Sequence, residues 1–78
     1  MNQNEIRPGA VYRHFRNRNL YRVHALVLHS ETLEEMVVYE ALYDNPRSKW
    51  WARPRSMFLE LVPVDGDRVP RFALVSED

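Results

Sequence analysis

The sequence contains no cysteine and only two glycines, and both shortages exclude chemistry. Without cysteine the chain has no disulfide, no thiolate nucleophile and no thiolate metal ligand. Gly9 and Gly66 stand alone, so no glycine-rich loop is available to bind a phosphate or a dinucleotide. The G-x-S-x-G turn of serine hydrolases is also absent. The sequence therefore excludes thiol catalysis and the common nucleotide-binding motifs.

Long apolar runs are missing as well. No apolar run exceeds four residues, the length of the run at residues 25–28, whereas a membrane-spanning helix needs about 20 residues. The first five residues are polar, and we therefore expect no signal peptide, no membrane association and a cytoplasmic location. A chain of 78 residues has room for one small domain, expected to span residues 1–78 with an ordered core at about 7–74.

Charges balance over the whole chain but alternate in blocks. The net charge is zero, yet residues 1–30 carry +4, residues 31–45 carry −5, residues 46–55 carry +4 and residues 56–78 carry −3. Two interpretations remain open. Strands of opposite charge pair across a sheet, or the first hairpin and the segment 46–55 form one basic face.

Alternation of apolar and polar residues predicts strands. Asp65-Gly66 is a strong hairpin signal, and residues 55–58, which follow Pro54, are expected to form one helical turn. A helix over residues 31–42 is disfavoured by the β-branched and aromatic run at 37–39. The predicted fold is all-β, a small antiparallel barrel of SH3-like shape with the helical turn before the penultimate strand. Its five or six short strands are expected at residues 10–15, 20–29, 36–43, 50–53, 59–64 and 68–74.

The predicted core consists of apolar residues with the least reason to face water. They are Val23, Val27, Val38, Leu42, Phe58 and Leu61.

Four segments of the chain are distinctive in order and spacing: residues 7–15 (RPGAVYRHF), 29–39 (HSETLEEMVVY), 51–60 (WARPRSMFLE) and 64–72 (VDGDRVPRF). Together they resemble the bacterial domain-of-unknown-function family 1653. The resemblance covers about residues 6–72 and departs at Arg18-Asn19, where the family usually has a glycine in the first hairpin. It implies a small bacterial cytosolic protein and brings no established activity.

Three histidines, His14, His24 and His29, raise the question of a metal site. No pair has compact ligand spacing, so we expect no metal and no cofactor. The turn from His29 to Thr32 is the most polar compact cluster, and its hydroxyls are expected to cap backbone amides. The alternative is a recognition turn in which His29 and Glu31 bind a partner.

Trp50 and Trp51 lie side by side in a predicted strand, so they point to opposite faces. One is therefore expected in the core and the other at the surface. An exposed tryptophan beside Arg53, with Tyr39 nearby, is typical of a stacking platform or an interaction hot spot.

These observations predict a non-catalytic binding module with a basic and aromatic surface, whose partner is RNA, single-stranded nucleic acid or an acidic protein segment. Two alternatives remain. A small hydrolase would place His14, His29 and Glu31 around a pocket as acid–base residues, and a homodimer would cover the exposed tryptophan, so monomer and homodimer stay open. The predicted binding residues are Arg13, His14, Arg16, His29, Glu31, Tyr39, Trp50, Trp51 and Arg53.

Overall fold

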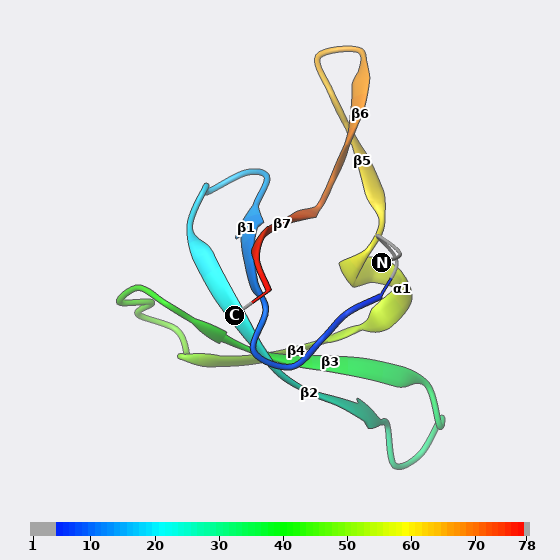
Figure 1. Cartoon of the computed structure of the whole chain (residues 1–78). Helices are drawn as coiled ribbons and strands as arrows, with labels where there is room; N and C mark the ends of the chain where they lie inside the picture. The colour runs from blue at the N-terminus through cyan, green and yellow to red at the C-terminus, as the bar shows by residue number, and fades with distance from the viewer. Residues whose placement is uncertain (1–4, 78) are drawn as a thin grey trace.

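The structure is a computed structural model that describes residues 5–77. Residues 1–4 and Asp78 lie outside the described residues. The expectation that the chain has no signal peptide concerns the first five residues, so it falls mostly outside the described residues. Strands and one short helix follow one another along the described part (Figure 1). They are β1 (Val11–His14), β2 (Leu20–Leu28), β3 (Glu35–Ala41), β4 (Trp50–Pro54), α1 (Arg55–Phe58), β5 (Leu61–Val64), β6 (Asp67–Pro70) and β7 (Phe72–Ser76).

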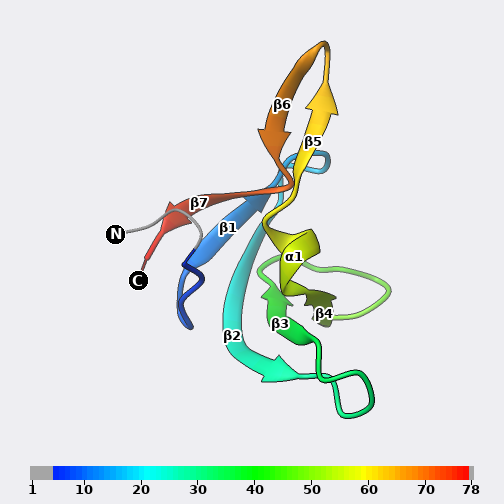
Figure 2. The same ribbon diagram turned by 90° about the vertical axis from the view of Figure 1, so that its right-hand side faces the viewer.

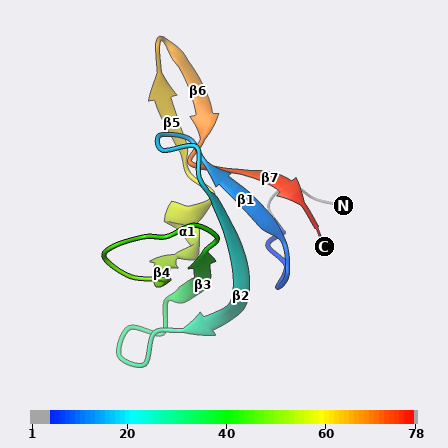
Figure 3. The ribbon, with the colours of Figure 1, turned by 90° about the vertical axis from the view of Figure 1, so that its left-hand side faces the viewer.

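The strands form two antiparallel sheets. Five of them pair in the order β4-β3-β2-β1-β7, and β5 pairs with β6. Figures 2 and 3 show β2 as a long bent strand and the β5–β6 hairpin projecting away from the main sheet. The predicted all-β class with one short helix is confirmed. No closed barrel is found among residues 5–77, where β4 and β7 are the two ends of the main sheet.

The main sheet stays open because β5 and β6, which follow α1, pair with each other and not with its edges β4 and β7. The Asp65-Gly66 turn has positive φ at both residues, 50° and 86°, so β5 and β6 form the tight hairpin that this dipeptide favours. Arg71 then separates β6 from β7 and donates its backbone N–H to the Glu60 carbonyl at 2.9 Å. The predicted strand over residues 68–74 is therefore two strands, and only the second pairs with β1.

An aromatic core lies between α1 and the inner face of the main sheet. Phe58 is fully buried, and its ring stacks on Phe72 with centroids 4.2 Å apart. Tyr12 and Tyr39 meet the Phe58 ring edge-on at 5.1 and 5.5 Å. The predicted burial of Phe58 and Val23 is confirmed. No helix in residues 5–77 is long and apolar enough to span a membrane.

The predicted burial of Val27, which lies beyond a β-bulge at His24, is wrong. Val23 is opposite Tyr39, but the next partners are Ala25 and Val38, so His24 is an extra residue in β2. One inserted residue exchanges the two faces of the strand beyond it. Val27 is 41% exposed, and Leu26 and Leu28 on the opposite face are 44% and 61% exposed, so this end of β2 extends beyond the core on both faces.

The prediction for β3 chose the wrong face of a correctly recognised strand. Val37, Tyr39 and Ala41 are buried, whereas Val38 is half-buried and Leu42 is 39% exposed on the other face. Leu61 is 47% exposed because it lies on the projecting β5–β6 hairpin. The predicted burial of Leu42 and Leu61 is therefore wrong, and Val38 is only partly covered.

Candidate functional site

A pocket of about 240 Å³ opens on the inner face of the main sheet, beside the aromatic core. Its walls come from β1, β2, β3, β4, β7 and the loops at residues 15–19 and 42–49. No Asp or Glu is among the lining residues. We call it the Arg53 pocket; its lining residues are His14, Asn17, Tyr21, Tyr39, Tyr43, Asn45, Trp51, Arg53 and Phe72.

Strand register explains why residues far apart in the sequence meet here. Tyr39 is directly opposite Trp51 in the β3–β4 pair, and Arg53 is opposite Val37. Alternate residues of a strand share a face, so Trp51 and Arg53 both point to the inner side. The Tyr21 and Tyr39 rings lie 5.5 Å apart across β2 and β3.

Two tyrosines on one wall share a hydrogen bond. The phenol oxygens of Tyr21 and Tyr43 are 2.5 Å apart. Asn17 donates from Nδ2 to the Tyr21 oxygen at 3.1 Å, and Asn45 donates from Nδ2 to the Tyr43 oxygen at 2.8 Å. Burial, followed by the hydrogen bond with Tyr43, raises the pKa of Tyr21 to about 12. The Tyr21 phenol is therefore neutral at physiological pH.

His14 borders the same pocket as a neutral ring. Its Nδ1 accepts the backbone N–H of Arg16 at 3.1 Å, which leaves the ring proton on Nε2. Burial is the largest cause that lowers the pKa of His14, and the charges of Arg53, Arg71 and Arg16 lower it further. A lowered pKa keeps the imidazole uncharged at pH 7.

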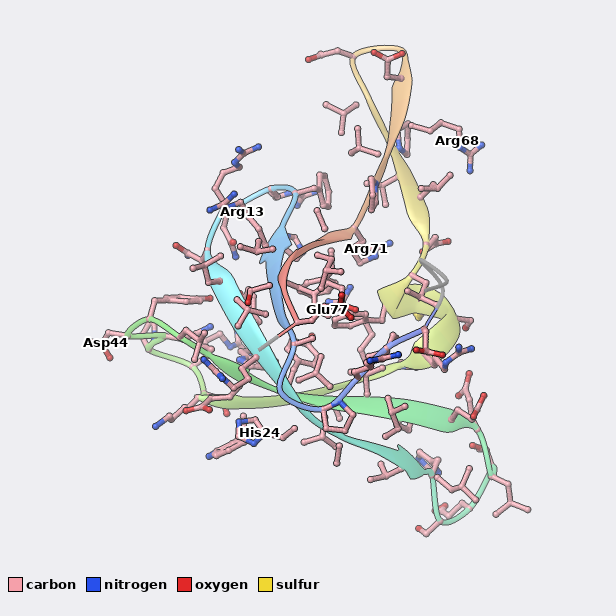
Figure 4. All side chains as sticks on the ribbon, viewed as in Figure 1. Arg13, His24, Asp44, Arg68, Arg71 and Glu77 are labelled. Atoms are coloured by element: carbon pink, nitrogen blue, oxygen red, sulfur yellow. The ribbon has the colours of Figure 1, made fainter. Side chains whose placement is uncertain are left out.

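Arg53 and Arg71 are neighbouring arginines with different surroundings. Arg71, which Figure 4 shows between the β6–β7 connection and α1, pairs with Glu60 at 2.8 Å and donates from Nε to the Met57 carbonyl at 3.1 Å. Arg53 lies over the Phe72 ring at 5.5 Å and forms no ion pair with any residue of the described range 5–77. Arg53 is thus a cation in a pocket that has no acidic lining residue.

Tyr39 lines the pocket, and the positive charge of Arg53 acts on its phenol. Burial raises the pKa of Tyr39, while the charge of Arg53 and its hydrogen bond to the phenol oppose that rise. The pocket therefore combines a fixed positive charge with neutral phenols and aromatic walls.

The structure brings four of the predicted binding residues together: His14, Tyr39, Trp51 and Arg53. Trp51 is half-buried and donates from its indole Nε1 to the Ser48 carbonyl at 2.9 Å. These four residues come from three different strands, and their side chains share one hollow.

Arg13 and Arg16 belong to other surroundings. Arg13 borders a separate hollow of about 300 Å³ near β7 and the β5–β6 hairpin, and Figure 4 shows it at the end of β1. Arg16 is exposed, with its guanidinium 5.5 Å from the Phe15 ring centre. The predicted basic surface is therefore divided between separate places.

His29 and Glu31 lie in the turn between β2 and β3. Figures 2 and 3 show this turn at the end of β2 opposite to the β1–β2 turn, next to which His14 lies. His29 Nδ1 accepts the backbone N–H groups of Glu31 and Thr32 at 3.2 and 3.3 Å, and Thr32 Oγ1 accepts that of Glu34 at 3.2 Å. These are capping contacts, and the three groups of the hydrolase alternative share no pocket.

Trp50 lies on the outer face of the sheet, away from the Arg53 pocket, and is 51% exposed. Its ring meets His24 at 4.7 Å. Glu40 binds His24 at 2.6 Å and Lys49 at 3.1 Å, and these two hydrogen bonds lower the pKa of Glu40. Figure 4 shows His24 on this outer side.

Four polar lining residues of the pocket are not among the predicted binding residues: Asn17, Tyr21, Tyr43 and Asn45. The available signal was that Tyr21, Tyr39 and Tyr43 occupy inward positions of two adjacent strands and the loop after them. Among residues 5–77 no group of three His, Asp or Glu side chains is arranged to hold a metal ion.

The fold and this pocket define a class: a small all-β domain with an open antiparallel sheet, one short helix and a basic aromatic hollow on its inner face. Residues 10–74 match the model of a family of proteins of unknown function, DUF1653. The chain belongs to the DUF1653 family.

One solved structure supports this assignment. It is the crystal structure of a DUF1653 protein from Bordetella bronchiseptica, with 33% sequence identity and a TM-score of 0.82. The similarity covers 96% of this chain and 94% of the Bordetella chain. A search of the curated proteins found no match.

Proposed function

We propose that this protein is a non-catalytic binding module that takes an acidic segment of a partner protein into the Arg53 pocket. The observation that carries the proposal is Arg53 itself. Its guanidinium lies in a pocket without Asp or Glu and has no ion pair within residues 5–77. A partly desolvated cation of this kind favours an anionic group from outside. Asp44 is adjacent in sequence to the lining residue Tyr43 but does not line the pocket; it is exposed in the loop after β3 (Figure 4).

Two features favour a protein segment over a nucleic acid. Stacking on bases requires open aromatic faces, but the Tyr21, Tyr39 and Phe72 rings meet one another edge-on and are buried. Nucleic-acid binding also favours a strongly basic surface, whereas the net charge of this chain is zero.

The hydrolase alternative has less support. It requires His14 to act with His29 and Glu31, but those two residues lie in the β2–β3 turn, where His29 Nδ1 accepts the backbone N–H groups of Glu31 and Thr32. A hydrogen-bonded, uncharged His14 suits recognition, because its Nδ1 is occupied by the Arg16 amide.

The test is an NMR titration of the labelled protein with a short glutamate-rich peptide and with the matched glutamine peptide. We expect the glutamate peptide alone to shift the signals of His14, Trp51 and Arg53. Arg53→Gln should weaken this binding about tenfold or more, since it removes a charge-assisted hydrogen bond.

The matched control is Arg68→Gln. Arg68 is exposed on β6, and Figure 4 shows it away from the main sheet. The Arg68→Gln variant should bind the glutamate-rich peptide like the wild type. Equal binding by the Arg53 and Arg68 variants would overturn the proposal. Tighter binding of a short single-stranded RNA than of the glutamate peptide would replace the protein segment with a nucleic acid.

A further inference from the structure

Three turns fix the orientation of three polar side chains around the Arg53 pocket. In each turn, a backbone N–H two residues further along donates to the side chain. Each side chain therefore has one acceptor atom occupied, and its other polar atom points away as a donor. The bonds run from Arg16 N–H to His14 Nδ1 at 3.1 Å, from Asn19 N–H to Asn17 Oδ1 at 2.8 Å and from Arg47 N–H to Asn45 Oδ1 at 2.9 Å.

These turns determine the hydrogen bonding of the two phenols. Because both amide oxygens are occupied, Asn17 and Asn45 present Nδ2 to Tyr21 and Tyr43, and both phenol oxygens act as acceptors. The pair has two hydroxyl protons. One proton forms the bond between the phenols, since their oxygens are 2.5 Å apart. One proton is left over, and the pair is a net donor.

His14 and Arg53 are donors too, and the Tyr39 phenol, which accepts a hydrogen bond from Arg53, keeps its own proton. His14 carries its proton on Nε2, for which no partner exists among residues 5–77, and Arg53 has guanidinium N–H groups but no ion pair in that range. The indole N–H of Trp51 is already bound to Ser48. Arg53, His14 and the phenol pair therefore offer hydrogen bonds from three sides, and none of the lining residues is acidic.

We infer that the Arg53 pocket is an oxyanion receptor that binds one carboxylate side chain of the acidic segment, and this inference rests on the proposed function. Arg53 supplies the charge, and His14 and the Tyr21–Tyr43 pair supply neutral donors. A volume of about 240 Å³ is large enough for several waters. That space suits a carboxylate with its aliphatic stem, flanked by Tyr39 and Trp51, and a single cation suits a single charge.

The number of hydroxyl protons predicts that the effects of Tyr21→Phe and Tyr43→Phe on peptide binding are not additive. Tyr21→Phe and Tyr43→Phe each remove one proton and one acceptor, so each single variant still has one spare hydroxyl proton. The double variant has none. We expect each single variant to bind the glutamate peptide within about threefold of the wild type and the double variant to bind about tenfold more weakly, by the loss of one hydrogen bond to a charged group.

A second variant, at Asn45, keeps the turn with Arg47 but replaces the donor to Tyr43 with an acceptor. Asn45→Asp retains an oxygen for the Arg47 N–H, because Asp and Asn cap such turns equally. Its second oxygen would accept the Tyr43 proton and bring negative charge to the pocket, so we expect binding of the glutamate peptide to fall more than about tenfold. Lys49→Gln is the matched control: it changes the net charge by the same amount from an exposed position in the same loop and should bind within about twofold of the wild type.

The outcomes separate this inference from the proposed function. If the peptide binds and depends on Arg53, but the double phenylalanine variant and Asn45→Asp bind like the wild type, the receptor assignment is overturned and the proposed function stands. If the folded wild type does not bind the glutamate peptide, both fail. Tighter binding of the matched phosphoserine peptide would overturn the choice of a carboxylate. Two-dimensional NMR spectra of each variant show whether its fold is intact.

Discussion

Phe58 is the buried residue of the short helix α1. Its ring is fully buried, lies nearly parallel to Phe72 with an interplanar angle of 4°, and is flanked by Tyr12 and Tyr39. The same Phe72 ring lies under Arg53 at 5.5 Å. Phe72 thus belongs both to the core, through Phe58, and to the lining of the Arg53 pocket.

Truncating this ring should be costly. We expect Phe58→Ala to lower the free energy of unfolding by about 3–5 kcal/mol, because the variant loses a large buried side chain and leaves a cavity. Leu42→Ala removes a side chain that is 39% exposed on the outer face and should cost less than about 1.5 kcal/mol. Urea denaturation of both variants measures the difference. Similar losses in the two would contradict the placement of Phe58.

At the scale of elements, turns and bulges decide which side chains face the pocket. The turn between β1 and β2 carries Asn17, and its hydrogen bond from Asn19 N–H orients the amide toward Tyr21. This turn holds Arg18 at a φ of 64°, a left-handed conformation that costs a residue with a side chain about 1–2 kcal/mol.

This strain gives a prediction that separates backbone from side-chain effects. Arg18→Gly and Arg18→Ala both remove the arginine, but only glycine adopts the left-handed backbone without cost. We expect the glycine variant to be about 1 kcal/mol more stable than the alanine variant, a difference reduced by the larger entropy of glycine in the unfolded chain. The midpoint of urea denaturation reports this difference. An alanine variant as stable as the glycine variant would show that the turn is not strained there.

The whole molecule consists of the main sheet with its core and a β5–β6 hairpin that extends away from it (Figure 2). Arg71 fastens the base of the hairpin: its backbone N–H and its guanidinium both bind Glu60, and its Nε binds the Met57 carbonyl. The outer part of the hairpin, around Asp65 and Gly66, is exposed.

This division predicts uneven protection from hydrogen exchange. Amides of β5 and β6 lie on a two-stranded sheet with few buried side chains, so local opening there should require less free energy than opening of β2 and β3. We expect β5–β6 amides to exchange well before those of β2 and β3, as measured by NMR-detected hydrogen exchange. Equal protection in the two regions would show that the hairpin opens only together with the core.

Much of the local structure was predictable from the sequence because local backbone preferences determine it. Alternation predicted the strands, Pro54 the start of the helical turn, and Asp65-Gly66 the tight hairpin. The opposite orientations of Trp50 and Trp51 follow from strand geometry alone, and Trp50 is indeed the exposed one. The site was predicted only in part, since His14, Tyr39, Trp51 and Arg53 meet in one pocket while the other predicted residues lie elsewhere.

The sequence by itself determined the all-β class, the order of the elements and the side chains that carry charge and aromatic rings. The tertiary structure decided that His24 forms a bulge, that the main sheet stays open, and that Asn17 and Asn45 meet the Tyr21–Tyr43 pair. Local preferences depend on neighbours in the chain, and the sequence displays these directly. Register, sheet closure and the meeting of donors and acceptors depend on residues such as Tyr21 and Tyr43, which only strand pairing brings within hydrogen-bond distance.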